Sequence, residues 1–262
     1  MGSFRKKIYW TLIKLGLSHP LASIIVTKDS SYRHDYKKFL SNLEFDLFDV
    51  GYPYPIVNEK NIPSGLIEGH YFKQDLLVAQ KIFKKNPKRH LDIGSRVDGF
   101  VAHVATFRPI EVADIRENNF VIDNISFVRM DFMNPLPKNM IGAYDSLSSL
   151  HALEHFGLGR YGDPVDAQGY LKGLQNFTEI LAQGGTLYLS VPIGKQTVLF
   201  NAHRIFSVQY LLKLSSEKFE LISFSYIDDK DHLFQNIAVT DDQAEKSFGC
   251  KYGCGIFEFR KK

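Results

Sequence analysis

The chain has 262 residues, of which 44% are hydrophobic and 23% are charged. This composition is typical of a globular protein with a substantial core, and it excludes a disordered or fibrous chain. A formal net charge of only +3 gives no reason to expect nucleic acid as a partner. The two cysteines are too few for a disulfide framework and have no zinc-type spacing, so we expect a cytoplasmic location.

The first 66 residues are expected to form a helical appendage and a linker. Apolar positions at helical spacing predict helices over about 3–15 and 32–43, and the prolines and glycines of 47–66 predict a linker. Residues 1–40 contain eight basic and two acidic residues, which a solvated helix face explains most simply. A peripheral contact with an anionic membrane surface and a homodimer contact stay open. No apolar run reaches the roughly 20 residues of a membrane-spanning helix, so no integral membrane segment is expected.

From residue 67 to residue 262 the pattern predicts one α/β domain. Strands are expected at 90–93, 110–115, 125–132, 143–150, 186–193, 219–227 and 255–260, and helices at about 69–85, 97–107, 167–183, from Ser207 onward and at 241–247. This alternation favours a Rossmann-like, mostly parallel sheet of seven strands with one antiparallel edge strand, flanked by helices. The helix at 167–183 is expected to stop at a glycine cap formed by Gly184 and Gly185.

The segment 90–100, HLDIGSRVDGF, predicts a buried strand, a turn at Gly94 and the start of a helix. Such a junction directs backbone N–H groups toward a nucleotide-like cofactor. Asp114 ends the next strand 20 residues later, where a carboxylate can accept hydrogen bonds from both hydroxyls of a ribose. Asp131 closes the third strand at the same edge, where it could accept from an adenine amino group with Phe132 against the ring. A turn-forming role is the alternative for each acid.

Polar side chains that suit chemistry follow the fourth and fifth strands. His203 and His155 are candidate general bases, because the pKa of imidazole suits proton transfer near neutral pH. The alternative for His203 is a structural role in its loop. Substrate-binding side chains are expected in two loops beyond these strands, and they are Arg160, Tyr161, Asn201 and Arg204. A solvated surface turn is the alternative for the first of these loops.

A metal site is not expected. His151 and His155 are four residues apart and share one face of a helical turn, which is a spacing that can bind a metal ion. The sequence offers no evident third ligand, so the prediction is that no metal is bound.

The motifs together resemble class I S-adenosylmethionine-dependent methyltransferases. The likeness covers about residues 69–260 and is carried by DIGS, the two strand-end acids, YDSLSSLHALEH and LAQGGTLYLSVP. The strings HYFKQDLLVAQKIF, HLDIGSRVDGFVAHVATFR, SLHALEHFGLGRYGDP and FNAHRIFS resemble a bacterial family called DUF268 (domain of unknown function two-sixty-eight). Members of that family commonly sit among genes for surface polysaccharide synthesis. The resemblance implies S-adenosylmethionine as the cofactor and a small-molecule or glycan acceptor such as a nucleotide sugar.

Carried over position by position, the resemblance assigns Asp92 and Gly94 to the cofactor motif, Asp114 to the ribose and Asp131 to the adenine. With neighbouring residues of the turn and of the strand ends, they form the expected set of cofactor-binding residues. The set is Asp92, Gly94, Ser95, Arg96, Asp98, Gly99, Asp114, Ile115, Asp131, Phe132, Ser149 and His151. The chain departs from the DxGxGxG motif, because Arg96 and Asp98 replace its second and third glycines and Gly99 comes one place late. Side chains there leave less room for the backbone to approach a ligand. Arg96 and Asp98 are expected to hold the methionine carboxylate and ammonium, or to pair with each other.

The sequence therefore predicts an enzyme that transfers a methyl group from S-adenosylmethionine, with O-methylation of a sugar or sugar-linked group in bacterial surface polysaccharide synthesis as the favoured reaction. One alternative is a non-catalytic methyltransferase-like binding or scaffold protein, for which Arg96 and Asp98 are the best support. Another is an NAD-dependent nucleotide-sugar oxidoreductase, which shares the glycine turn and the strand-end acid but would need a GxGxxG motif. The acceptor, the choice between O- and N-methylation and the oligomeric state stay open.

Overall fold

The computed structural model describes residues 8, 11, 30–42, 62–65, 67–119 and 121–262. The chain divides into two compact units, Met1–Leu66 and Ile67–Lys262, which are described separately. In the first unit, helix α3 spans Ser30–Ser41, close to the helix expected at 32–43. Most of the helix expected at 3–15 and of the linker expected at 47–66 lies outside the described residues. The role of this unit as an appendage stays a prediction.

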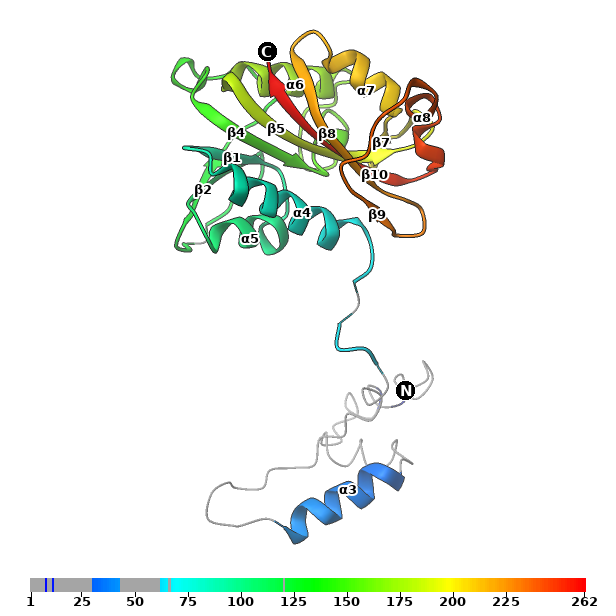
Figure 1. Cartoon of the computed structure of the whole chain (residues 1–262). Coiled ribbons are helices and arrows are strands. Elements are labelled where there is room, and N and C mark those ends of the chain that lie inside the picture. The colour runs from blue at the N-terminus through cyan, green and yellow to red at the C-terminus, as the bar shows by residue number, and fades with distance from the viewer. Residues whose placement is uncertain (1–7, 9–10, 12–29, 43–61, 66, 120) are drawn as a thin grey trace. The chain divides into compact units, whose positions relative to one another are not determined.

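The second unit is built on an eight-stranded, mostly parallel sheet in the order β3-β2-β1-β4-β5-β10-β8-β9 (Figure 1). Its strands are β1 (His90–Ile93), β2 (Ile110–Asp114), β3 (Ile125–Arg129), β4 (Tyr144–Leu150), β5 (Leu181–Ile193), β8 (Phe219–Ile227), β9 (Leu233–Phe234) and β10 (Gly253–Lys261). Strands β1 to β5 pair in parallel, and β10 is antiparallel to both of its neighbours, β5 and β8. The predicted Rossmann-like, mostly parallel sheet with flanking helices is confirmed.

The predicted strand count is wrong, and the antiparallel end of the sheet holds more than one antiparallel strand. The two-residue strand β9 pairs with β8 and makes an eighth strand. Strand β10 lies inside the sheet, between β5 and β8, rather than at an edge. Six of its nine residues are buried, as expected for a strand covered on both faces. The apolar run GCGIF at its start is the sequence signal for this central position.

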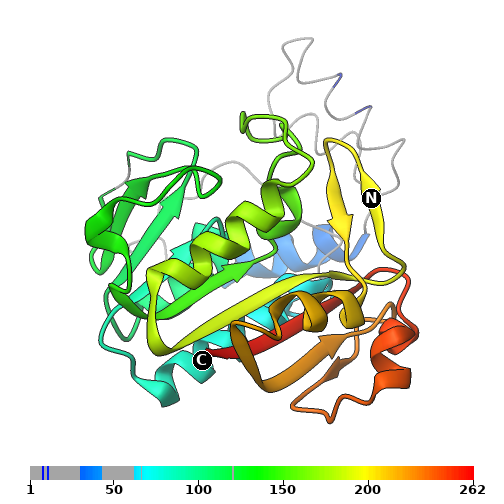
Figure 2. The same cartoon turned by 90° about the horizontal axis from the view of Figure 1, so that it is seen from above.

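Helices cover both faces of the sheet (Figures 1 and 2). One face carries α4 (His70–Lys85), a π-helical turn (Val97–Val101) and the short α5 (Ala102–Ala105), and the other carries α6 (Gly169–Ile180) and α7 (Val208–Ser215). Two separate clusters of buried side chains follow this layering. The first includes Val78, Ile82, Phe100 and Tyr188, and the second includes Phe177, Leu187, Phe206 and Phe257. The rigid layers fix the positions of the loops between them.

Of the two predicted helix caps, one is confirmed and the other is wrong. Ser207 caps α7, because its hydroxyl accepts a hydrogen bond from the Tyr210 N–H at 3.4 Å. The glycine cap at Gly184 and Gly185 is wrong, because α6 ends at Ile180 and the chain is already extended at its C-cap, Leu181. The glycines instead lie within β5, near the point where the β4–β5 register is irregular.

Three other elements refine the predicted pattern. The helix expected at 97–107 is a π-helical turn followed by only one turn of α-helix. The helix expected at 241–247 is α8 (Asp241–Glu245), which begins with a capping box between Thr240 and Gln243. The loop expected after β5 contains a separate hairpin of β6 (Thr197–Leu199) and β7 (His203–Ile205).

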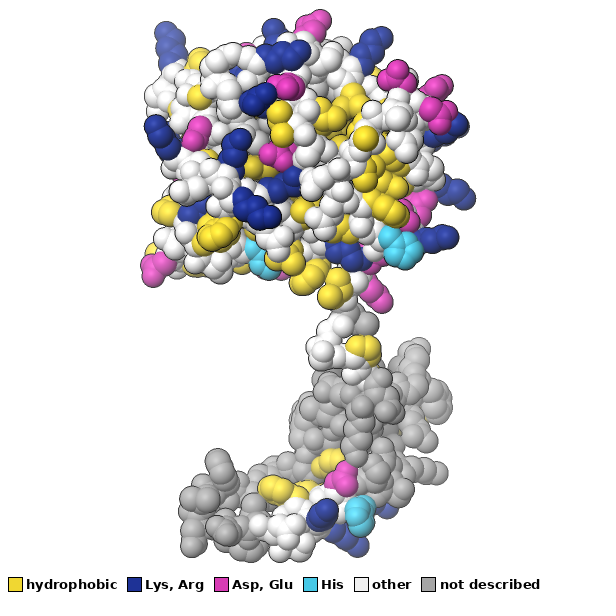
Figure 3. All heavy atoms as spheres, in the orientation of Figure 1, with side chains coloured by type: hydrophobic (Ala, Val, Ile, Leu, Met, Phe, Trp, Pro, Cys, Tyr) yellow, Lys and Arg dark blue, Asp and Glu magenta, His cyan; other side chains and the backbone are white. Residues whose placement is uncertain are grey.

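Basic and acidic side chains alternate with hydrophobic ones over the visible face of the second unit (Figure 3). This face therefore offers no continuous basic surface of the kind that duplex nucleic acid requires. Among the described helices, none is long and apolar enough to cross a membrane.

Candidate functional site

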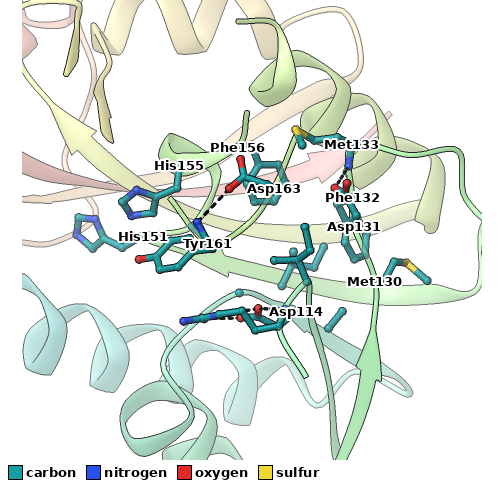
Figure 4. A pocket seen from close by; sticks show the side chains of 16 residues that line it. Asp114, Met130, Asp131, Phe132, Met133, His151, His155, Phe156, Tyr161 and Asp163 are labelled. Atoms are coloured by element: carbon teal, nitrogen blue, oxygen red, sulfur yellow. Dashed lines mark hydrogen bonds and ion pairs between the residues drawn. The ribbon is translucent and has the colours of Figure 1, made fainter. Parts of the chain in front are cut away.

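A pocket lies at the carboxyl ends of the parallel strands (Figure 4). It sits where the strand order reverses, between β1 and β4, which is where ligands bind in open α/β sheets. Figure 4 shows His151 and His155 at one end of the pocket and Asp131 and Phe132, which follow β3, at the other. Asp114 and Tyr161 lie between the two ends. The pocket brings together eight of the residues expected in the site, which are Gly94, Asp114, Ile115, Asp131, Phe132, His151, His155 and Tyr161.

Gly94 turns the chain sharply from β1 into the pocket wall. Its φ is 71°, in the left-handed region that favours glycine. A Cβ at this position would lie 2.9 Å from the Cβ of Ala152, which lines the same pocket. The turn therefore requires glycine for its backbone conformation and for the close approach of the segment after β4.

Asp114 stands at the end of β2 and lines the pocket as expected. Its carboxylate accepts hydrogen bonds from the Arg116 N–H, Nε and Nη2 at 2.8, 2.9 and 2.6 Å. The Arg116 guanidinium also lies 4.5 Å from the centre of the Tyr161 ring. A ribose bound here would share the carboxylate with Arg116, which the sequence reasoning missed.

Asp131 forms the expected turn and also lies in the pocket. Its carboxylate accepts from the Met133 N–H at 2.8 Å and from the Asn134 side chain at 3.2 Å, so it forms the turn after β3. It also lines the pocket beside Phe132, whose ring packs against Phe177 at a centroid distance of 5.9 Å. This end of the pocket is therefore apolar with one acceptor group.

Asp92 lies beneath the pocket rather than in its wall. It is fully buried and accepts from the hydroxyls of Ser95 and Ser148, each at 2.6 Å, and from the Ser95 N–H at 3.0 Å. The Ser95 hydroxyl in turn accepts from the Leu150 N–H at 3.1 Å. Burial raises the pKa of Asp92 to about 7, although its hydrogen bonds act in the opposite direction. Asp92 and Ser95 thus join the turn after β1 to β4.

The two residues that replace motif glycines pair with each other. Arg96 donates from Nε and Nη2 to the two carboxylate oxygens of Asp98, at 3.0 and 2.8 Å, and both side chains are exposed. Neither lines the pocket. Gly99 faces Asp75 of α4 instead of a ligand, because a Cβ there would lie 2.6 Å from the Asp75 carboxylate.

His151 follows β4 in a conformation rare for a residue with a side chain. Its φ is 51°, and its N–H donates to the Ser190 carbonyl at 3.0 Å. Its Nδ1 pairs with the Glu154 carboxylate at 2.9 Å. Burial lowers the pKa of His151, but the Cys254 sulfur and the Glu154 carboxylate together raise it to about 10. Ser149, the other residue expected here, is buried in β4, and its hydroxyl has no partner within the described structure.

The two candidate bases differ in position. His155 lines the pocket and donates from Nδ1 to the Ala202 carbonyl at 2.6 Å, which leaves Nε2 as the acceptor of the neutral ring. His203 lies on β7, outside the pocket lining, with its ring 5.1 Å from that of Tyr252 and 6.5 Å from that of His155. Burial lowers the pKa of both histidines.

The expected substrate-binding side chains separate into two groups. Tyr161 lines the pocket, and the exposed Arg160 donates to the Ala202 carbonyl at 3.1 Å. Asn201 is exposed in the turn between β6 and β7, with a φ of 64°. Arg204 does not reach the pocket, because its buried guanidinium donates to the carbonyls of Glu154, Phe156 and Ala167.

Asp163 is a further residue of the pocket that sequence reasoning did not assign. Its carboxylate accepts from the N–H groups of Gly157, Gly159 and Tyr161 at 2.8, 3.1 and 3.1 Å. It therefore shapes the glycine-rich loop that carries Tyr161 over the pocket. An aspartate before proline inside such a loop is the signal that could have indicated this role.

The fold is that of class I S-adenosylmethionine-dependent methyltransferases. The structure resembles that of the Burkholderia thailandensis 1,6-didemethyltoxoflavin-N1-methyltransferase with bound S-adenosylhomocysteine, at a TM-score of 0.52 and 13% identity over 73% of this chain and 79% of that chain. It also resembles a Bacillus halodurans protein assigned as a methyltransferase, at a TM-score of 0.50 and 14% identity over 71% of this chain and 98% of that chain. The TM-scores show a shared fold.

Residues 100–251, more than half of the chain, match the family described as "Caenorhabditis protein of unknown function, DUF268". The chain belongs to this family. No curated protein matches the chain. The family description names no bacterial source and no substrate, so the expected link to polysaccharide synthesis finds no support in it.

Proposed function

We propose that this protein is an S-adenosylmethionine-dependent methyltransferase that binds its cofactor in the pocket between β1 and β4. The observation that carries the proposal is the arrangement of that pocket, with Asp114 midway between an apolar end and a histidine-bearing end. The apolar end suits adenine, with Phe132 against the ring and Asp131 as acceptor. Asp114 suits the ribose, so the methionine end points toward His151 and His155. The Burkholderia enzyme of the same fold contains S-adenosylhomocysteine, the product of this cofactor.

The reaction we propose is a direct transfer of methyl from the sulfonium to an acceptor oxygen. The cofactor supplies a reactive methyl donor, so the protein has to align the acceptor and exclude water. A hydroxyl acceptor must also lose a proton. His155 is the better candidate base, because it lines the pocket and Ala202 holds its Nδ1, which leaves Nε2, 3.8 Å from the Glu154 carboxylate, as the acceptor. His203 is then a neighbour that shapes the acceptor side.

The acceptor we propose is a hydroxyl of a sugar or sugar-linked group, such as a nucleotide sugar. Aromatic rings gather beside the histidine end of the pocket, with Tyr161 edge-on to His155 at 5.3 Å and Tyr252 at 5.1 Å from His203. Flat aromatic faces with polar edges suit a ring that is apolar on its faces and hydroxylated around its rim. A role in bacterial surface polysaccharide synthesis rests on the motif resemblance alone.

Methyl-labelled S-adenosylmethionine, incubated with a panel of nucleotide sugars and free saccharides, tests this proposal. We expect label in one class of sugar and a stoichiometric amount of S-adenosylhomocysteine. Cofactor binding without transfer to any acceptor would instead favour the non-catalytic binding protein, for which the exposed Arg96–Asp98 pair remains the best support. An NAD-dependent oxidoreductase is disfavoured, because β10 runs antiparallel inside the sheet, unlike the parallel strands of a dinucleotide fold.

A further inference from the structure

Three side chains that bind transition metals converge at the histidine end of the pocket. They are His70 at the first position of α4, His151 after β4 and Cys254 on β10. Their ligand atoms all lie within 4.8 Å of one another. Within the described ranges, no other group of three histidine, cysteine or acidic side chains comes together in this way.

His151 is oriented as a metal ligand would be. Its Nδ1 is held by the Glu154 carboxylate at 2.9 Å, and Glu154 is 1% exposed. The other ring nitrogen, Nε2, is buried and has no hydrogen-bond partner in the part of the chain that the structure describes. Histidine ligands commonly donate their second nitrogen to a carboxylate, which fixes the ring and makes it a better ligand. An unpartnered buried nitrogen otherwise costs free energy.

Cys254 is fixed in place and has only weak polar contacts. It is fully buried, and its backbone pairs with Pro192 on one side and Ile227 on the other. Its sulfur lies 3.4 Å from the Gln74 side-chain oxygen, which already accepts from the Ser190 hydroxyl at 2.6 Å. The central strand therefore presents this sulfur to the cluster, beside His151 and Gln74.

His70 completes the cluster from the opposite side. Its ring stacks on that of His151 at a centroid distance of 5.3 Å and an interplanar angle of 10°, and it lies 5.8 Å from the ring of Tyr252.

We propose that His70, His151 and Cys254 bind one divalent transition-metal ion of the Zn²⁺ type. Imidazole and thiolate ligands favour zinc over magnesium or calcium. Zinc lies about 2.0–2.3 Å from such ligands, so the three atoms would move inward by roughly 1 Å to reach it. The ion displaces one proton from the His151 ring and one from the Cys254 thiol to solvent, and the resulting thiolate and the Glu154 carboxylate offset its two charges. Sequence reasoning expected no metal, because the ligands come from three distant elements and form no motif.

Three protein ligands leave a fourth coordination position open, as in catalytic zinc sites. Because His151 also lines the pocket, this position would face the acceptor side, where the ion could bind an acceptor hydroxyl and lower its pKa. That role depends on the proposed methyl transfer, whereas binding of the ion does not.

Titration of the full-length, chelator-treated protein with Co²⁺ and then Zn²⁺ tests the proposal. We expect one Co²⁺ per chain with a sulfur-to-cobalt charge-transfer band, and displacement of the cobalt by Zn²⁺. Cys254→Ser should abolish that band, and His70→Gln should weaken Zn²⁺ binding at least about tenfold. Cys250→Ser is the matched control, because Cys250 is also buried but lies outside the cluster. It should leave the band and the affinity unchanged.

The absence of a Co²⁺ band in the wild-type protein, or a band that survives Cys254→Ser, would overturn the metal site. Far-ultraviolet circular dichroism of each variant checks that it is folded, and His70→Gln tests the site even where the cysteine variant is unfolded. A parallel titration with S-adenosylhomocysteine separates the two proposals. Metal binding without cofactor binding would contradict the proposed function and support the metal site. Cofactor binding without metal binding would contradict the metal site and support the proposed function.

Discussion

A single hydrogen bond distinguishes the two candidate bases at the residue scale. The Ala202 carbonyl fixes the tautomer of His155, which lines the pocket, and leaves Nε2 as the acceptor. We therefore expect His155→Ala to lower the rate of methyl transfer by about 10²–10⁴-fold, the usual contribution of a general base. His203→Ala should lower it far less. Initial rates with saturating cofactor measure both, and full turnover by His155→Ala would contradict the assignment.

Asp114 is the residue on which cofactor affinity should depend most. Loss of hydrogen bonds to a charged group costs about 1.5–3 kcal/mol, so Asp114→Asn should weaken S-adenosylhomocysteine binding about tenfold or more. Asp98→Asn is the control, because Asp98 forms a similar ion pair with Arg96 outside the pocket. Equal affinities of the two variants, measured by calorimetry, would show that Asp114 does not contact the ribose.

Some residues of the pocket could be predicted from the sequence, and others could not. The acids Asp114 and Asp131 could be placed in the pocket, because parallel strands end at one edge of a sheet. Their hydrogen-bond partners could not be predicted, since the contact of Arg116 with Asp114 depends on the path of the loop after β2. The burial of Arg204 was missed for the same reason, because the hairpin that directs it was expected to be a loop.

At the element scale, the turn after β1 depends on Gly94. Alanine there would meet both an unfavourable positive φ and the Ala152 side chain at 2.9 Å. The backbone effect costs about 1 kcal/mol and overpacking adds about 1–3 kcal/mol. Gly184→Ala is the matched control, because Gly184 has a φ of 74° and no atom near the added Cβ. We expect urea denaturation to show a larger loss of stability for Gly94→Ala, and equal losses would contradict the packing argument.

The positions of the main strands could be predicted at this scale, but their order could not. The apolar periodicity and the glycines between elements predicted β1, β2, β4 and β8 to within a few residues. The insertion of β10 between β5 and β8 is a non-local pairing, which local patterns do not specify. The same insertion brings Cys254 close to His70 and His151. The metal ligands therefore could not be predicted from the sequence either.

At the scale of the whole molecule, the buried Asp92 should make stability depend on pH. Its folded-state pKa of about 7 lies above the ordinary value near 4, so the folded state binds the proton more tightly than the unfolded state. The resulting stabilisation is full below about pH 4 and is lost as the pH rises through about 7. Burial of Asp75, which raises its pKa to about 6, adds an effect of the same sign.

We expect Asp92→Asn to remove up to about 1.4 kcal/mol per pH unit from the slope of unfolding free energy between pH 5 and 7. Urea denaturation at several pH values measures this slope. Asp98→Asn, a change at an exposed position, should leave it as in the wild type. An unchanged slope in Asp92→Asn would mean that Asp92 is ionised throughout this range.

The most direct test of the central claim is calorimetric titration of the full-length protein with S-adenosylhomocysteine and, separately, with NAD⁺. The account predicts one S-adenosylhomocysteine site per chain with micromolar affinity, weakened by Asp114→Asn, and no heat of binding with NAD⁺. Binding of NAD⁺, or no heat with S-adenosylhomocysteine, would contradict the assignment of the pocket between β1 and β4 to a methyl donor.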